Sequence, residues 1–285
     1  MRDTLKRLKD KPFGSFGGRE NTMDWGMKNR MARIIQPKTG KALMLAVDHG
    51  YFLGPTSGLE DLGKTVAPLL PYTDSLMLTR GALRQCINAA TNTPIVLRVS
   101  GGNSVLEEDL SDEDLTVDIE DAIRLNASAI TMSIYVGSPH QHQTIVNLAK
   151  AVDWGQKFGI PVLAVTAVGK EMARDERYLS LACRIAAETG AHMVKTYYCE
   201  DFSRLVKKVP IPVVVAGGKK IPEKEAFELT FKSIREGAVG VDMGRNIFQA
   251  ESPVAMIQAV RSIVHENHSV KKALELYHDL LSKKN

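Results

Sequence analysis

Lys195 ends the otherwise apolar run AHMVK. Burying an ammonium group is costly unless it is paired, and burial lowers the pKa of a lysine amine. A lysine kept neutral can attack a ketone carbonyl and form an imine. Lys195 is therefore a candidate Schiff-base nucleophile, provided that Ala191 and Met193 face inward with it. The alternative is a structural lysine paired with a buried carboxylate, Asp242 or Asp48.

Glycines and basic residues occur together at two places, in the runs AGGKK and DMGRN. Glycine lets backbone N–H groups approach an anion closely, and Lys or Arg neutralises its charge. A helix that starts just afterwards adds partial positive charge. We predict a phosphate site formed by Gly217, Gly218, Lys219, Gly244 and Arg245. The alternative is a pair of ordinary glycine turns with exposed basic residues.

Further polar residues end other apolar runs. Asp48 and His49 could each act as a general acid or base. The alternatives are an ion-pair partner for Asp48 and a hydrogen-bonded turn residue for His49. Tyr135 could donate a proton or orient a hydroxyl, or simply pack. Arg98 and Lys170 could contact a substrate phosphate or carboxylate, or pair with acidic side chains.

Other reactive residue types give weaker signals. His140 and His142 are two positions apart, so they would not share a helix face, and no third ligand lies nearby. We therefore expect no metal site. Cys199 is expected to be an inert thiol, because no base is placed for it. The acidic run LEEDLSDEDL, residues 106–115, is expected to be a surface loop with a helix N-cap at Ser111.

The elements that must position these residues follow a regular rhythm. Continuous apolar or β-branched runs are typical of parallel strands buried on both faces. Helical periodicity separates the runs, and several of these segments end at a glycine, as helix C-termini do. The eight predicted strands are Ala42–Asp48, Ser75–Thr79, Ile95–Ser100, Ala129–Val136, Pro161–Thr166, Ala191–Lys195, Ile211–Ala216 and Val239–Met243.

Alternating strands and helices predict a parallel α/β architecture, and eight units fit a closed (β/α)8 TIM barrel. We assign residues 1–40 to an N-terminal arm, with a helix around Trp25–Ile35, and residues 41–285 to the barrel. The segment Val270–Lys283 predicts an extra C-terminal helix. In such barrels the active site lies at the carboxyl ends of the strands, where the residues above are expected.

Composition excludes several other classes of protein. The net charge is only +4, from 37 Lys+Arg and 33 Asp+Glu, with no long basic run, which argues against nucleic-acid binding. Three cysteines without a CxxC pair fit a reducing compartment. No apolar leader and no run near the ~18 apolar residues of a membrane span are present. We expect a cytoplasmic enzyme.

The chain resembles the archaeal-type, or DhnA-type, class I aldolase family. The resemblance rests on LAVDHG, SIYVGS, VKTYY, VVVAGGKK and VDMGRNIFQ, which occur in the expected order across nearly the whole barrel. Within the family the chain is most similar to the thiolases of autoinducer-2 breakdown, on residues 23–45, 48–60 and 166–188.

The resemblance implies an activity and roles for residues. The activity is transfer of the acetyl group of 3-hydroxy-5-phosphonooxypentane-2,4-dione to coenzyme A, which gives acetyl-CoA and dihydroxyacetone phosphate. Coenzyme A would be a co-substrate, with no bound cofactor, and the enzyme would be a ring-stacked homo-oligomer, a decamer. The implied residues are a Schiff-base Lys195, the acid–base residues Asp48, His49 and Tyr135, and the phosphate ligands Gly217, Gly218, Gly244 and Arg245.

Two alternatives to this activity remain. One is a class I aldolase that cleaves fructose 1,6-bisphosphate. Such aldolases carry an arginine-containing segment after the fifth strand, where this chain has TAVGK at residues 166–170. This departure favours a monophosphate, although Lys170 could substitute. The other alternative is a barrel that binds a phosphosugar without turnover.

Overall fold

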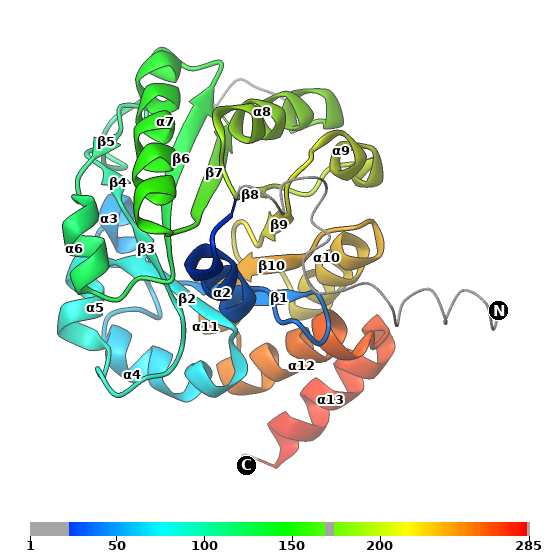
Figure 1. Ribbon diagram of the computed structural model, residues 1–285. Helices are drawn as coiled ribbons and strands as arrows, with labels where there is room; N and C mark the ends of the chain where they lie inside the picture. Colours follow the sequence, from blue (N-terminus) through cyan, green and yellow to red (C-terminus); the bar gives the residue numbers. More distant parts are fainter. Residues whose placement is uncertain (1–22, 169–173, 284–285) are drawn as a thin grey trace.

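The computed structural model describes residues 23–168 and 174–283. Most of the predicted arm, and Lys170, lie outside the described residues. Eight parallel strands close into a barrel in the order β1-β10-β9-β8-β7-β6-β3-β2. Helices surround this ring (Figure 1). The predicted (β/α)8 fold is confirmed.

Every predicted apolar run overlaps one strand of the barrel, and β7 and β8 extend one or two residues beyond their predicted ends. The runs are almost wholly buried, because the strands face the barrel interior on one side and helices on the other. Their bounds are β1 Ala42–Ala46, β2 Ser75–Thr79, β3 Ile95–Arg98, β6 Ala129–Val136, β7 Val162–Val168, β8 Met193–Thr196, β9 Val213–Ala216 and β10 Gly240–Met243.

The helices follow the strands around the barrel. Gly159 and Gly190 end two of them with φ values of +68° and +108°, a left-handed conformation that suits glycine. The helices are α3 Gly50–Leu53, α4 Leu62–Val66, η1 Ala67–Tyr72, α5 Arg80–Cys86, α6 Ile119–Arg124, α7 Gln141–Phe158, α8 Glu176–Thr189, α9 Phe202–Lys208, α10 Glu223–Arg235, α11 Arg245–Phe248, α12 Pro253–Glu266 and α13 Val270–Ser282. The last is the predicted C-terminal helix. None of the helices in the described part of the chain is long and apolar enough to cross a membrane.

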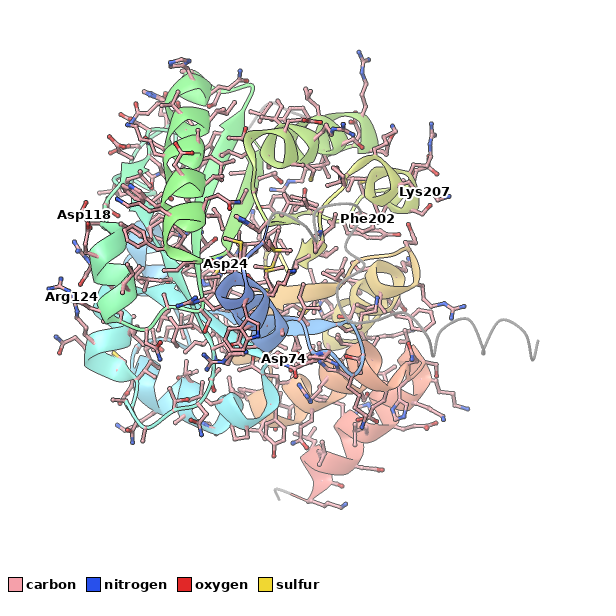
Figure 2. The ribbon with its side chains drawn as sticks, in the orientation of Figure 1. Asp24, Asp74, Asp118, Arg124, Phe202 and Lys207 are labelled. Atoms are coloured by element: carbon pink, nitrogen blue, oxygen red, sulfur yellow. The ribbon has the colours of Figure 1, made fainter. Side chains whose placement is uncertain are left out.

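Helix α2, Trp25–Ile34, closes the barrel at the amino ends of the strands. Asp24 begins it by accepting a hydrogen bond from the Met27 backbone N–H at 2.7 Å. Figure 1 shows the helix across the centre of the strand ring, and Figure 2 marks Asp24 there. Ile34 and Ile35 are fully buried against the inward-facing side chains of the strands. The opposite end of the barrel remains as the entrance to its interior.

The acidic segment at residues 106–115 differs from the prediction. Its end forms β5, Asp114–Leu115, which pairs antiparallel with β4, Ser100–Gly101. Ser111 is not a helix N-cap, because its hydroxyl donates to Asp109 and no helix begins there. The hairpin turns the chain back toward the barrel, and Glu113 is thereby only 1% exposed. The predicted surface loop is confirmed for most of the segment, whereas the helix N-cap at Ser111 is wrong, and Ser111 and Glu113 are buried.

Candidate active site

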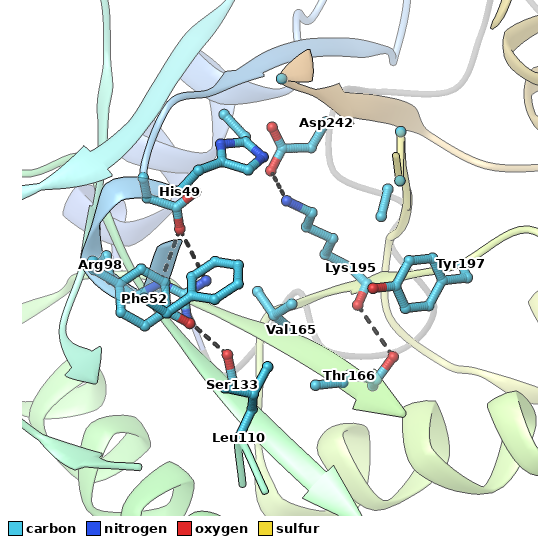
Figure 3. A pocket seen from close by; sticks show the side chains of 18 of the residues that line it. His49, Phe52, Arg98, Leu110, Ser133, Val165, Thr166, Lys195, Tyr197 and Asp242 are labelled. Atoms are coloured by element: carbon cyan, nitrogen blue, oxygen red, sulfur yellow. Dashed lines mark hydrogen bonds and ion pairs between the residues drawn. The ribbon is translucent and has the colours of Figure 1, made fainter. Parts of the chain in front are cut away.

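A cavity of about 560 Å³ lies at the carboxyl ends of the barrel strands, as Figure 3 shows. Its size suits a small organic ligand. Every predicted site residue that the structure describes lines it, so the structure brings them together while their roles stay predictions. These residues are Asp48, His49, Arg98, Tyr135, Lys195, Gly217, Gly218, Lys219, Gly244 and Arg245.

Lys195 points into this cavity from β8 and meets Asp242 of β10 (Figure 3). Its Nζ lies 2.8 Å from Asp242 Oδ2. Met193 packs inside the barrel, as expected. Ala191 precedes the strand and packs between the barrel and the surrounding helices. Burial raises the pKa of Asp242 despite the nearby charge of Lys195. This carboxylate can therefore take the ammonium proton more readily than an exposed aspartate could.

Asp48 forms a second buried ion pair, with Arg98. Asp48 Oδ2 lies 3.0 Å from both Nε and Nη2 of Arg98, and both residues are buried. Burial alone would raise the pKa of Asp48, but the charges of Arg98 and Lys195 outweigh burial and lower it. Asp48 is thus a carboxylate at neutral pH. The ion-pair alternative holds for this residue, which nevertheless lines the cavity.

His49 packs beside the glycine loop at Gly244. Its ring meets Phe248 edge-on, with the ring centroids 5.6 Å apart. Burial lowers the pKa of His49 to about 4, so its imidazole is neutral at physiological pH. A Cβ at Gly244 would lie 2.4 Å from His49 Cε1 and 2.4 Å from the Ala46 carbonyl oxygen. Glycine is therefore required for the close approach between this loop and His49.

The two glycine loops, at Gly217–Gly218 and at Gly244, are joined by a residue that was not predicted, Asn246. Its amide donates to the Gly217 carbonyl oxygen at 2.7 Å and accepts from the Ile221 N–H at 2.9 Å. Arg245 lines the cavity from the same loop, and its buried Nε has no hydrogen-bond partner among the described residues. A buried donor without an acceptor is costly, and the positive charge of Arg245 at the cavity favours an anion there.

Glu113 is the buried carboxylate that sequence reasoning missed. The Tyr135 hydroxyl donates to Glu113 Oε1 at 3.0 Å, and the Tyr51 hydroxyl donates to the same oxygen at 2.7 Å. Ser100 donates to Oε2 at 2.6 Å. Burial, and then the charge of Glu113, raises the pKa of Tyr135, so its phenol stays protonated. The sequence carried no clear signal for it, because the two short strands of the hairpin are joined by the long connection at residues 102–113.

Arg174 extends the list of cationic residues at the cavity. It follows the TAVGK segment, residues 166–170, in which the arginine of fructose-bisphosphate aldolases is missing. Its guanidinium stacks over the Tyr197 ring, 3.9 Å from the centroid. Both residues line the cavity. An arginine is therefore present on this side, although the TAVGK segment has none. The prediction of a monophosphate substrate rested on residues 166–170, which end four residues before Arg174.

The remaining reactive residues are Cys199 and the side chains that could bind a metal ion. Burial raises the pKa of the Cys199 thiol to about 11, so it stays protonated, as an inert thiol would. In residues 23–168 and 174–283, no group of three or more His, Cys, Asp and Glu side chains is arranged to hold a metal ion.

The sequence and fold were compared with known proteins. A family model described as DeoC/LacD family aldolase matches residues 42–250. The chain is similar to the 3-hydroxy-5-phosphonooxypentane-2,4-dione thiolase of Photorhabdus laumondii, with 56% identity over 256 residues, 90% of this chain and 88% of the relative. A protein of the same name from Escherichia coli K12 is 55% identical over 256 residues, 90% of this chain and 88% of the relative.

A solved structure shares the fold over most of the barrel. It is an archaeal fructose-1,6-bisphosphate aldolase with its catalytic lysine covalently bound to the carbinolamine intermediate of the substrate. Its TM-score is 0.74 at 25% identity, and the match covers 84% of this chain and 99% of that chain.

Proposed function

Because the chain belongs to the DeoC/LacD family of aldolases, we propose that it transfers the acetyl group of 3-hydroxy-5-phosphonooxypentane-2,4-dione to coenzyme A. The products are acetyl-CoA and dihydroxyacetone phosphate. The observation that carries the proposal is the amine of Lys195 in the cavity, 2.8 Å from a buried carboxylate and beside two glycine loops. The names of the relatives support the choice of substrate.

Binding begins at the phosphate. The loops at Gly217–Gly218 and Gly244–Arg245 hold it, and the unpartnered Nε of Arg245 is satisfied. With the C5 phosphate fixed, the adjacent C4 ketone is the carbonyl placed toward Lys195. Holding the substrate in one orientation lowers the activation barrier, because the substrate loses its translational and rotational entropy on binding and not in the reaction step.

Lys195 then attacks C4. Asp242 takes the proton of the ammonium, and the amine forms an imine with loss of water. The thiol of coenzyme A attacks C2, the C2–C3 bond breaks, and its electron pair moves toward the imine nitrogen to give an enamine. A proton added at C3 and hydrolysis of the imine release dihydroxyacetone phosphate and free Lys195.

Coenzyme A, the assembly and the location are further parts of the proposal. The word thiolase in the relatives' names supports coenzyme A as the acceptor. We also propose that the protein works as a homo-oligomer, a decamer, in the cytoplasm. The assembly rests on the family resemblance, and the location rests on the cysteine content and the lack of a long apolar run in the sequence.

The first experiment traps the imine. Wild-type protein is incubated with dihydroxyacetone phosphate and sodium borohydride, and its intact mass is measured. An adduct is expected on the wild type and on Lys64→Met, which removes an exposed lysine, but not on Lys195→Met. Folded wild-type protein that gains no adduct from this ketone or from the diketone phosphate would contradict the proposal.

A second candidate function is aldol cleavage of fructose 1,6-bisphosphate. The observation that favours it is Arg174, which lines the cavity and could hold a second phosphate. The two functions differ in their need for a thiol. Release of triose phosphate without coenzyme A, lost in Arg174→Met, would favour the aldolase. Acetyl-CoA formation that stops when coenzyme A is omitted would favour the thiolase.

A further inference from the structure

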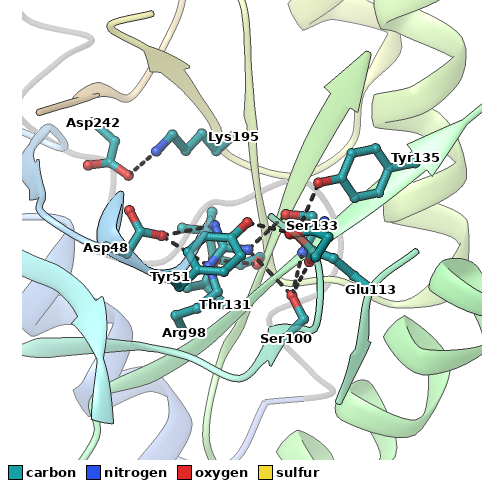
Figure 4. A network of polar contacts seen from close by, with 12 residues as sticks. Asp48, Tyr51, Arg98, Ser100, Glu113, Thr131, Ser133, Tyr135, Lys195 and Asp242 are labelled. Carbon is teal, nitrogen blue, oxygen red and sulfur yellow. Dashed lines mark hydrogen bonds and ion pairs between the residues drawn. The ribbon is translucent and has the colours of Figure 1, made fainter. Parts of the chain in front are cut away.

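The β4–β5 hairpin places a carboxylate behind Tyr135, away from the cavity. Glu113 is 1% exposed and does not line the cavity, whereas Tyr135 does. The phenol proton of Tyr135 is directed at Glu113 Oε1, 3.0 Å away. The hydroxyl of Tyr135 thus donates to Glu113, and Tyr135 is the member of this pair that lines the cavity. Figure 4 shows this arrangement.

Glu113 belongs to the same buried polar network as the Asp48–Arg98 pair. Asp48 and Glu113 share one cation, Arg98, which contacts Asp48 directly. Arg98 reaches Glu113 only through the Ser100 hydroxyl, over contacts of 3.4 and 2.6 Å. The Ser100 hydroxyl therefore links Glu113 to the cation that Asp48 contacts directly.

We propose that Tyr135 and Glu113 form a proton relay, in which Glu113 is the final acceptor of the proton that Tyr135 takes from the attacking thiol. This inference rests on the proposed function. As the thiol S–H bond breaks, a new O–H bond forms on Tyr135, and the original Tyr135 proton moves to Glu113. The relay runs in reverse when the proton is returned to C3 of the enamine. The number of protons is therefore conserved over the cycle.

The relay explains how a tyrosine in this position can act as a base. Burial and the charge of Glu113 raise the pKa of Tyr135, which makes a free tyrosinate unfavourable. Passing the proton on to Glu113 at the same time avoids the tyrosinate. Glu113 touches neither substrate and is a positioning residue that acts through Tyr135.

The test is a double-mutant cycle with Glu113→Gln, Tyr135→Phe and the double variant. Glutamine keeps an acceptor for the tyrosines but cannot take up a proton. We expect kcat to fall by about 10²- to 10⁴-fold in each single variant, with KM changed less than about threefold. Because both residues serve one relay, the double variant should be no slower than the slower single variant. The acidic limb of the kcat–pH profile should be lost in Glu113→Gln.

The controls separate the relay from a structural role. Ser100→Ala removes one donor to Glu113 but leaves the acceptor, so kcat should stay within about tenfold of the wild type. Borohydride trapping on Lys195 should persist in all variants. Multiplicative effects in the double variant, a wild-type pH profile in Glu113→Gln, or loss of trapping in a folded Glu113→Gln protein would each overturn the relay.

The assays also separate failure of the relay from failure of the proposed function. All variants are measured for whatever carbon–carbon cleavage the wild type performs. Cleavage that does not need coenzyme A would contradict the acetyl-transfer proposal. The cycle would then test the relay on the substrate hydroxyl in place of the thiol. A folded wild type without turnover on either substrate would overturn both.

Discussion

At the scale of single residues, the cavity is defined by pairs of opposite charge with different surroundings. Asp242 and Asp48 are both buried, yet burial raises the pKa of the first, while Arg98 and Lys195 keep that of the second low despite burial. One aspartate can therefore accept a proton while the other stays charged. Such divergence within one site is what acid–base chemistry near neutral pH requires.

His49 gives a prediction for the pH dependence of stability. Burial lowers its pKa from 6.5 to about 4 in the folded protein. Between these values the unfolded chain binds a proton that the folded protein does not, so stability is lost as pH falls from 6.5 to 4. The contribution is at most about 3 kcal/mol. Urea unfolding across this range should show a shallower loss in His49→Gln, and equal slopes in both proteins would contradict the assignment.

At the scale of elements, the apolar runs were enough to locate all eight strands, because both faces of each strand are buried. The glycine loops and Lys195 could be predicted since they follow directly from strand ends. The contacts of Glu113 could not, because they depend on a hairpin of two-residue strands whose sequence reads as an exposed acidic loop. Asn246 was missed because its three hydrogen-bond partners, Gly217, Lys219 and Ile221, lie far from it along the chain.

Helix α2 gives a prediction at this scale. Ile34 is fully buried beneath the barrel, whereas Trp25 of the same helix is 79% exposed. Ile34→Ala leaves a cavity and should lower the free energy of unfolding by about 2–5 kcal/mol. Trp25→Ala should change it by less than about 0.5 kcal/mol, as surface substitutions do. Chemical denaturation measures both, and equal effects would mean that α2 does not seal the barrel.

At the scale of the whole molecule, the barrel closes where its first and last strands meet. Residues of β1 pair with residues of β10 in register, Ala42 with Gly240. A Cβ at Gly240 would lie 2.0 Å from the Ala42 carbonyl oxygen. The seam therefore closes only because this residue has no side chain, and the ring depends on a contact between positions nearly 200 residues apart.

Gly240→Ala should open this seam. The overpacking should lower the free energy of unfolding by about 1–3 kcal/mol or more. Gly81→Ala is the matched control, because a Cβ there meets nothing within 4 Å. In helix α5 this control should be neutral or slightly stabilising. Thermal unfolding compares the two, and similar melting temperatures would contradict the role of Gly240.

The sealed base has a kinetic consequence. Because α2 covers the amino ends of the strands, we expect both reactants to reach Lys195 from the carboxyl ends, where the cavity lies. The diketone must reach Lys195, which is only 9% exposed, before the thiol arrives. We therefore expect an ordered mechanism, in which the phosphoketone binds first and the triose phosphate is released last. On the proposed function, coenzyme A that binds before the diketone would block the entrance to the cavity, so a high concentration of coenzyme A should inhibit the reaction.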